Sequence, residues 1–509
     1  MNNTRYRIAM DGRRIAFGLA VVSLILPVTN VFVTKPAAAL VAASSPPFAW
    51  DLETVDANRD TGLSTSVALT DAGVPYISYI DSTQRLLRVA HRTPTNWSSE
   101  IVAGPGSYTG NTNIAIGPGN AVQVSYFNQT SNAVFFAASG PSGWTTTRID
   151  SGFSEGWNRF AIDPAGRPGI VYTGFDGSLR LASWNGTGWS IEVIDSTTVT
   201  SRYPDLAFDA LSQPRISYYG SGTLLYAEKS DGRWTRSVID GTEGAGLFSR
   251  IRLDSNGAPH IAYYASRNTS LMYATGGTTG WTRSLVDSGG DVGIDLSLTV
   301  DSADRPHIAY YQRTSGTLRY AIGTVRGWIR ETVDNSGVVG WYTGIATDSR
   351  GFPHISYYDW TDRSLRYARG KIALQVRSLP ASPIDLTSVT LTGELVAFGN
   401  HSEAMVKFEL RVDGEARTLI VGNVTKPGTF SFAVANLSTD AVYEFQAIAR
   451  AGNETSRGTN LTFRLTALSH PFPLDVLLVS VGVGVGSFAA LFIAYFVRGR
   501  RRGKSKSRD

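Results

Sequence analysis

The chain of 509 residues contains no cysteine, so no disulfide cross-links it and no thiol takes part in its chemistry. Histidine is scarce as well, with six residues, which leaves few nitrogen ligands for a metal ion. A nucleophile elbow, a phosphate-binding loop and a zinc-binding helix motif are also missing. The sequence therefore indicates no cofactor, and stability must come from the area of the buried core.

The net charge of +5 is concentrated at the two ends of the chain. Four arginines lie in the first 14 residues, and seven cations lie between Arg498 and Arg508. The part between these ends has more acidic than basic residues. A nucleic-acid partner is therefore not expected, because phosphate backbones are bound by basic surfaces.

The N-terminal end has the three parts of a secretory signal. Arg5, Arg7, Arg13 and Arg14 precede an apolar stretch over 15–33, and small residues follow over 37–43. This pattern predicts a signal peptide over 1–43, cleaved near Ala39 or Ala43. The alternative is an uncleaved membrane anchor.

The C-terminal end has the pattern of a single membrane span. Residues 476–497 carry no charge, and as a helix they would be about 33 Å long, enough to cross a hydrocarbon core of about 30 Å. The basic residues of 498–509 follow directly and favour a cytoplasmic tail. We therefore expect a single-pass cell-membrane protein with its N-terminus and a large domain outside. A buried core helix is the alternative.

Three kinds of residue recur seven times between the two ends, at steps of 45 to 47 residues. The tryptophans are Trp50, Trp97, Trp144, Trp189, Trp234, Trp281 and Trp328. The tyrosines are Tyr79, Tyr126, Tyr172, Tyr218, Tyr263, Tyr310 and Tyr357, and the alanines are Ala90, Ala137, Ala182, Ala227, Ala274, Ala321 and Ala368. A repeat of this length is typical of solenoids and propellers.

Each unit consists of four short alternating segments separated by turn residues. In the sixth unit we expect strands over 297–301, 306–311, 317–321 and 328–334. The seventh unit lacks its tryptophan strand, whereas an unpaired one begins the repeat region over 48–56. The N-terminal strand should therefore complete the last unit and close a ring without open sheet edges.

These repeats resemble the Asp-Ser-x-Gly-x-Pro-His-Ile-Ala-Tyr-Tyr propeller repeats of bacterial and archaeal surface proteins. The turns at Asp254, Asp301 and Asp348 carry the Asp-Ser part of the motif. The resemblance implies an all-β fold with a seven-bladed β-propeller over 48–369.

A strand-rich segment without the repeat follows over 371–467. Its segments 389–395, 406–412 and 443–449 alternate with period two. Leu437 followed by Tyr443 resembles the tyrosine corner of fibronectin-type-III sandwiches. We expect a β-sandwich that acts as a spacer; an independent binding module is the alternative.

Nine Asn-x-Ser/Thr sequons are glycosylation candidates. They are Asn96, Asn128, Asn185, Asn268, Asn400, Asn423, Asn436, Asn453 and Asn460.

His260, His307 and His354 occupy one position of three successive units. This position is one strand away from the ring axis, so the three side chains should lie about 10 Å or more apart. They are expected to bond to neighbouring turns rather than to share a metal, whose ligands must all lie within about 2.1 Å of it.

One ring of positions departs from the repeat, at the start of each innermost strand. Innermost strands converge on the axis, so these side chains should meet at one mouth of the channel. The ring is Ser66, Asn113, Arg159, Asp205, Arg250, Ser297 and Gly344. Arg159, Asp205 and Arg250 form either a binding site for a carboxylate or sugar, or a closed structural salt bridge.

Aromatic residues off the repeat register are further binding candidates, because flat rings suit the apolar faces of sugars. We place them in loops on the same face; simple packing onto this face is the alternative. Besides Trp184, they are Trp157, Tyr203, Phe248, Trp341, Tyr342 and Trp360.

The sequence favours a surface recognition or adhesion protein that binds glycan or a surface partner. A sialidase-like glycosidase or lyase is a second hypothesis, which requires acidic residues near Arg159 and Arg250. However, the Asp-Ser turns lack the aromatic residue of an Asp-box, and a third arginine and paired carboxylates are not assignable. A structural role in the cell envelope is the third hypothesis.

Overall fold

The computed structural model describes residues 48–58, 60–108, 110–151, 156–197, 201–277, 279–385, 387–399, 401–439, 441–468, 476–483 and 490–494. The predicted signal peptide, the basic tail and Asn400 lie outside them. Within these ranges every element is a β-strand except a short 3-10 turn, η1 (Pro118–Asn120).

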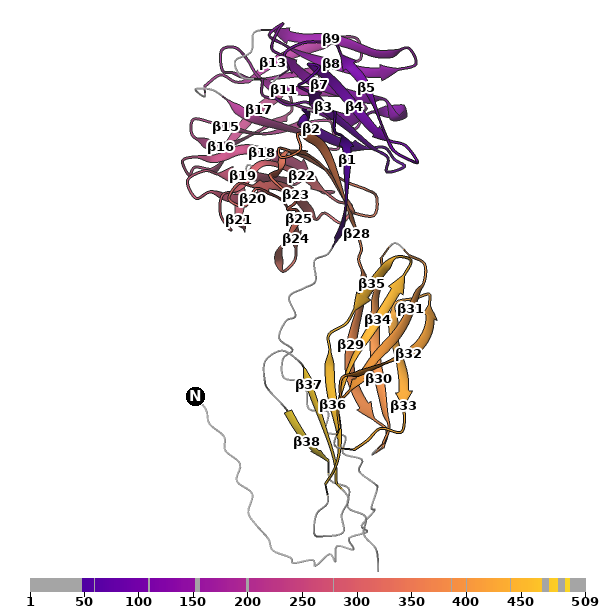
Figure 1. Ribbon diagram of the computed structural model, residues 1–509. Helices are drawn as coiled ribbons and strands as arrows, with labels where there is room; N and C mark the ends of the chain where they lie inside the picture. The colour runs from indigo at the N-terminus through magenta and orange to yellow at the C-terminus, as the bar shows by residue number, and fades with distance from the viewer. Residues whose placement is uncertain are drawn as a thin grey trace, which may run out of the picture. The chain divides into compact units, whose positions relative to one another are not determined.

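Seven four-stranded antiparallel sheets follow one another in the described part of residues 48–371 (Figure 1). Sheet 1 contains β2 (Thr61–Leu69), β3 (Pro75–Asp81), β4 (Leu86–Arg92) and β5 (Trp97–Ala103). Sheet 2 contains β6 (Asn113–Ile116), β7 (Val122–Asn128), β8 (Ala133–Gly140) and β9 (Gly143–Ser151). Sheet 3 contains β10 (Asn158–Ile162), β11 (Pro168–Thr173), β12 (Leu179–Trp184) and β13 (Trp189–Asp195). Sheet 4 contains β14 (Arg202–Phe208), β15 (Pro214–Gly220), β16 (Thr223–Ser230) and β17 (Arg233–Asp240).

Sheet 5 contains β18 (Ala245–Leu253), β19 (Pro259–Ala265), β20 (Ser270–Gly277) and β21 (Gly280–Asp287). Sheet 6 contains β22 (Val292–Val300), β23 (Pro306–Gln312), β24 (Thr317–Thr324) and β25 (Gly327–Asp334). Sheet 7 contains β26 (Val339–Thr347), β27 (Pro353–Asp359), β28 (Ser364–Lys371) and the N-terminal β1 (Ala49–Asp56).

The sheets close on themselves as in a β-propeller. The first strands of successive sheets contact one another in order, and β26 contacts β2. A separate cluster of buried apolar side chains fills each seam between neighbouring sheets. Strand β1 pairs antiparallel with β28, which confirms the predicted completion of the last sheet by the N-terminal strand.

The second strands carry the repeated tyrosines, and each of six donates a hydrogen bond to an aspartate at the end of the preceding sheet's outermost strand. The O–O distances are 2.6–2.8 Å. The pairs are Tyr79–Asp56, Tyr172–Asp150, Tyr218–Asp195, Tyr263–Asp240, Tyr310–Asp287 and Tyr357–Asp334. The Tyr79–Asp56 pair joins sheet 1 to β1, so the same bond also seals the ring.

The repeated tryptophans make a second set of hydrogen bonds between the same neighbouring sheets. Six indole Nε1 atoms donate to a side chain on the preceding outermost strand at 2.8–3.4 Å, and the acceptor is a glutamate in four seams and a serine in two. The repeated Trp and Tyr side chains are therefore structural, as their fixed register suggests.

Among the three repeated histidines, His307 makes the predicted hydrogen bond to the neighbouring turn, whereas His354 Nε2 has no hydrogen-bond partner among the described residues. His307 Nε2 lies 3.1 Å from Asp301 Oδ2 in the preceding turn, and its Nδ1 lies 2.6 Å from the hydroxyl of Tyr320. His260 and His354 contact the corresponding turn aspartates at 3.5 and 3.9 Å. The turns themselves have the expected Asx bonds: Asp301 Oδ1 accepts the N–H groups of Ala303 and Arg305 at 3.0 and 2.9 Å.

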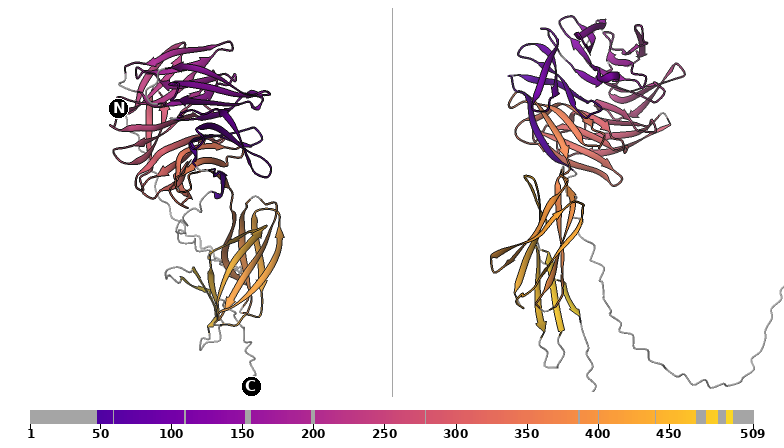
Figure 2. Two further views of the ribbon diagram at one scale, coloured as in Figure 1. Left: turned by 45° about the horizontal axis from the view of Figure 1, so that its top comes forward. Right: turned by 90° about the vertical axis from the view of Figure 1, so that its right-hand side faces the viewer.

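The C-terminal module is a β-sandwich with its own apolar core (Figure 2). One sheet has β29 (Leu374–Pro383), β30 (Val389–Phe398) and β33 (Gly428–Val434). The other has β32 (Glu415–Val424), β31 (Ala404–Val412), β34 (Val442–Ala451) and β36 (Leu461–Leu468), and β35 (Glu454–Arg457) pairs with β34. The Tyr443 hydroxyl accepts the N–H of Ser438 at 2.7 Å, which is the contact that the Leu437–Tyr443 pattern suggested.

The described part of the segment expected to form a membrane helix consists of strands instead. Strands β37 (Val476–Val483) and β38 (Ala490–Ala494) extend the second sheet from β36. Valine-rich segments suit a strand, because branched side chains favour extended backbone and an unpaired sheet edge offers partners. The described residues contain no helix with the length and apolarity needed to span a membrane.

The Tyr–Asp bond can be tested by removing a single hydroxyl. Tyr263→Phe should lower the free energy of unfolding by about 1–2 kcal/mol, because the buried Asp240 carboxylate loses a donor. Tyr126→Phe is the matched control, since Ala103 stands where the other seams have aspartate. Equal losses for both variants in denaturant titrations would contradict a special contribution of the Tyr–Asp pair.

Acid should weaken the propeller through its buried histidines. Burial, and next the charge of Arg369, lower the pKa of His354 to about 4. An unfolded histidine titrates near 6.5, so between the two values the unfolded chain binds more protons. The stability contributed by neutral His354 is therefore complete above about pH 6.5 and is lost as the pH falls toward 4, with a total loss of about 3 kcal/mol.

We expect His354→Gln to flatten the dependence of the unfolding free energy on pH between pH 7 and pH 4.5. His401→Gln, in the C-terminal module, should keep the steeper dependence of the unsubstituted chain. An unchanged slope in His354→Gln would refute this assignment.

Candidate functional site

In five of the seven sheets the innermost strand begins with a bulge that turns one side chain out of the strand alternation. In sheets 1, 5, 6 and 7 a glycine with φ near +100° comes first, and a Cβ at Gly246 would lie 2.8 Å from the Leu224 side chain. Two positions later, a non-glycine residue has φ of about +50° and the pairing register shifts. The same shift occurs in sheet 4 at Tyr203.

The bulge corrects the predicted position of several aromatic residues. Tyr203, Phe248, Trp341 and Tyr342 lie within β14, β18 and β26 rather than in loops before them. Likewise, β22 begins at Val292 instead of 297, because the bulge at Asp295 is part of the strand. The alternation of apolar and polar residues is interrupted at a bulge, so the sequence showed only the part of the strand after it.

The seven positions of the predicted ring line one cavity of about 70 Å³ on the axis. Thr65, Arg252 and Thr343 complete its polar wall. The ring was identified from its departure from the repeat, and the structure brings all of its members together.

The main contacts of Asp205 differ from the predicted salt bridge with Arg159 and Arg250. Its Oδ2 accepts the backbone N–H of Ile251 at 2.8 Å and Arg252 Nη1 at 3.0 Å. Arg159 Nε lies 4.0 Å from Oδ1. The direct hydrogen-bonding cation is therefore Arg252, two positions after Arg250.

The two arginines of the ring are oriented by neutral oxygen atoms. Arg250 Nη1 donates to the carbonyls of Phe248 and Ser249 at 3.2 and 2.7 Å. Arg159 Nη1 donates to Asn113 Oδ1, and Asn113 Nδ2 in turn donates to Asn158 Oδ1 at 3.0 Å. These bonds hold the guanidinium groups in place without neutralising them.

Two polar atoms at the cavity have no hydrogen-bond partner among the described residues. They are Arg159 Nε and Thr65 Oγ1, and Thr65 is only 5% exposed. A buried polar group without a partner costs about 1–3 kcal/mol, and these two atoms are the ones of this kind that belong to residues lining the cavity.

The cavity contains more positive than negative side chains. Burial, and then the charge of Arg250, hold the pKa of Arg159 well below its ordinary value, although Asp205 acts in the opposite direction. Burial likewise lowers the pKa of Arg250 to about 10. Asp295 faces the same arginines, and burial raises the pKa of its carboxyl. Three arginines thus oppose two carboxyls.

An arc of aromatic rings lies two positions before the ring residues of sheets 3, 4 and 5. The ring centroids of Trp157 and Tyr203 are 4.2 Å apart, and those of Tyr203 and Phe248 are 4.7 Å apart. Each ring precedes one of Arg159, Asp205 and Arg250 by two residues. We call Trp157, Tyr203 and Phe248 the aromatic arc.

The other predicted aromatic residues form a second group in sheet 7. Trp341 lies 5.7 Å from Trp360 and 6.1 Å from Tyr342, and Trp360 is 54% exposed. The Tyr342 N–H donates to Asp295 Oδ2 at 3.3 Å, which links this group to the cavity. Trp184 belongs to neither group, since it packs against Trp189 on the outer strands of sheet 3.

Sequence reasoning missed Arg252, Asp295 and Thr65. Arg252 follows Arg250 by two residues, and such residues share one face of a strand. Asp295 stands where sheets 4 and 5 have Tyr203 and Phe248, so the repeat alignment contained the signal. Thr65 becomes notable only through its lack of a partner.

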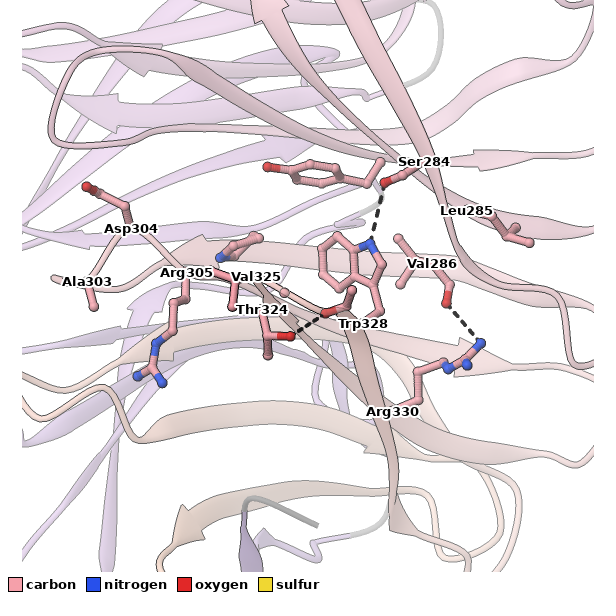
Figure 3. A pocket seen from close by; sticks show the side chains of 14 residues that line it. Ser284, Leu285, Val286, Ala303, Asp304, Arg305, Thr324, Val325, Trp328 and Arg330 are labelled. Carbon is pink, nitrogen blue, oxygen red and sulfur yellow. Dashed lines mark hydrogen bonds between the residues drawn. The ribbon is translucent and has the colours of Figure 1, made fainter. Parts of the chain in front are cut away.

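A larger cavity lies elsewhere, with a volume of about 660 Å³ in the seam between sheets 5 and 6 (Figure 3). Trp328 Nε1 donates to Ser284 Oγ at 3.4 Å there, and Arg330 Nη1 donates to the Val286 carbonyl at 3.2 Å. Leu285 and Val325 are exposed beside them. Because its polar groups serve the repeated tryptophan contact, we regard this groove as part of the architecture and the axial cavity as the candidate site.

The sequon asparagines are mostly accessible. Asn128 is half-buried, whereas the other seven described ones are exposed: Asn96, Asn185, Asn268, Asn423, Asn436, Asn453 and Asn460.

No protein-family model and no curated protein sequence matches the chain. Among solved structures, it is similar to AofleA from Arthrobotrys oligospora, at 11% identity over 56% of this chain and 89% of that one, with a TM-score of 0.40. A fucose-specific lectin from Aleuria aurantia has 15% identity over 56% of this chain and 100% of its own, with a TM-score of 0.40. Hydrazine synthase from Kuenenia stuttgartiensis has 12% identity over 61% of this chain and 96% of its own, with a TM-score of 0.45. Likenesses this distant leave the site and its function to be argued from the residues of the chain.

Proposed function

We propose that this protein is a cell-surface recognition or adhesion protein whose seven-bladed propeller binds a glycan at the face bearing the axial cavity. The observation that carries the proposal is the aromatic arc directly beside a polar cavity. Sugar rings have apolar faces that pack on aromatic rings and hydroxyl groups that need hydrogen-bond partners. The rings of Trp157, Tyr203 and Phe248 contact one another in sequence, and each precedes a cavity residue by two positions, so we expect a ring surface at the mouth of the cavity.

A sialidase-like glycosidase or lyase is the second candidate. It requires acidic residues beside Arg159 and Arg250, and Asp205 and Asp295 meet that condition. However, a cavity of about 70 Å³ is far smaller than the roughly 300–1,000 Å³ of typical ligand pockets. Both carboxyls already accept hydrogen bonds from the chain, so we favour binding over hydrolysis. A purely structural envelope role is the third candidate, and it gives the buried unpartnered atoms no purpose.

The remaining chain fits an exterior protein on a stalk. We propose that the repeats belong to the bacterial and archaeal surface type, that the sandwich over 371–467 is a fibronectin-type-III-like spacer, and that 1–43 direct secretion. The sequence further supports a membrane anchor over 476–497 with the tail over 498–509 in the cytoplasm. In a bilayer this segment would leave the sheet edge where β37 and β38 pair and form a helix, which satisfies its own backbone hydrogen bonds. We also propose sugar chains at the sequons where the host attaches them.

A glycan array tests recognition. The detergent-solubilised full-length chain should bind a defined subset of glycans, and Trp157→Ala/Trp341→Ala should lose at least 10-fold in signal, because stacking area is removed. Trp184→Ala, outside both aromatic groups, should bind like the unsubstituted chain. If no glycan binds, a protein partner or an envelope role replaces the glycan proposal.

Membrane fractionation tests the anchor. The full-length chain should remain with membranes after carbonate washing, whereas a chain ending at residue 470 should be released, because the uncharged segment is lost. Retention of the shortened chain would point instead to the uncleaved N-terminal segment.

A further inference from the structure

We propose that the axial cavity receives the carboxylate of an acidic sugar whose ring lies on the aromatic arc. This inference rests on the proposed glycan recognition and specifies its ligand. Three independent observations support it: the size of the cavity, its charge and its unpartnered donors.

The volume of the axial cavity restricts it to a small ligand group. The cavity of about 70 Å³ is small compared with the roughly 300–1,000 Å³ of typical ligand pockets, so it holds a few waters or a small polar group. A carboxylate fits this space, whereas a sugar ring must stay outside at the mouth. Trp157 lies directly before β10, and Tyr203 and Phe248 lie within β14 and β18. Each stands two residues before a cavity residue, so we expect their contacting rings to form the surface on which the sugar ring would lie.

The excess positive charge of the cavity favours an anionic ligand group. Arg250 is only 7% exposed, and it shares the cavity with Arg159 and Arg252. Asp205 is already engaged by Arg252 and the Ile251 N–H, and Asp295 accepts the Tyr342 N–H. Burying like charges together is unfavourable, so an incoming anion would stabilise the arginine pair.

The two hydrogen-bond donors without a partner at the cavity favour a ligand group that accepts hydrogen bonds. Arg159 Nε and the Thr65 hydroxyl have no hydrogen-bond partner among the described residues. An ionised carboxylate only accepts hydrogen bonds and offers about four lone-pair sites on two oxygens. It can therefore satisfy the guanidinium and the hydroxyl together, and bonds from an arginine to a carboxylate are stronger than bonds between neutral groups.

The test compares an acidic and a neutral sugar on the full-length chain. We expect D-glucuronate to quench tryptophan fluorescence with an affinity at least 10-fold above that of D-glucose. Arg159→Gln should remove this difference by weakening glucuronate alone. Arg236→Gln, whose side chain pairs with Asp195 in an outer seam, is the matched control and should leave both affinities unchanged.

Thr65→Val separates a binding role from a structural one. The substitution keeps the shape of the side chain but removes a hydroxyl that has no partner among the described residues. We expect the affinity for glucuronate to fall several-fold while the thermal midpoint of the free protein stays the same or rises. A residue with only a structural role would lower the midpoint and leave affinity unaffected.

Several results would overturn the inference. Equal affinities for glucuronate and glucose, unaffected by Arg159→Gln, would remove the carboxylate site but leave glycan recognition standing. Equal binding of glucose 6-sulfate would show a general anion site. Tighter binding of a peptide with uncharged side chains and a free C-terminal carboxylate would indicate a protein partner. Binding of no sugar here or on the array would overturn the proposed function itself.

Discussion

The hydrogen bond between the repeated tyrosine and the aspartate of the preceding sheet is the contact on which the propeller depends. Both partners are buried, as in Tyr263 and Asp240, and a buried carboxylate without a donor is expensive. The bond therefore forces neighbouring sheets into one register. The Tyr79–Asp56 pair extends the rule to the N-terminal strand, so the ring closes by the same chemistry that builds it.

The candidate site follows from the same geometry. Fixed sheets bring seven innermost strands together, and in five of them a bulge near the start turns a variable side chain out of the strand alternation. Glycine is needed at the bulge for two reasons, its positive φ and the close approach of a leucine such as Leu224. The same backbone geometry recurs in these sheets, and the position two residues after the glycine is serine, tyrosine, phenylalanine or aspartate. Recognition can change there without altering the ring.

Sequence alternation predicted most strands and failed where the backbone leaves the regular pattern. The second to fourth strands of sheet 6 begin within one residue of their expected positions, because turn residues mark their limits. The first strand begins five residues early, since the bulge at Asp295 hides its start. At the C-terminus, an uncharged valine-rich segment satisfies the patterns of both a membrane helix and a strand, and β37 is a strand. Composition does not separate these two states, because both bury the same side chains.

The sequence by itself determined the period of the repeat, the N-terminal strand that completes the last sheet, and the ring of variable positions at the axis. These features depend on spacing along the chain, which a repeat displays directly. Only the tertiary structure decided that Arg252 rather than Arg250 holds Asp205, that Asp295 joins the arginines, and that Arg159 Nε and Thr65 Oγ1 lack partners among the described residues. Such contacts join residues about 45 or more positions apart at distances of 3–4 Å, and a shift of one ångström in strand placement would rearrange them.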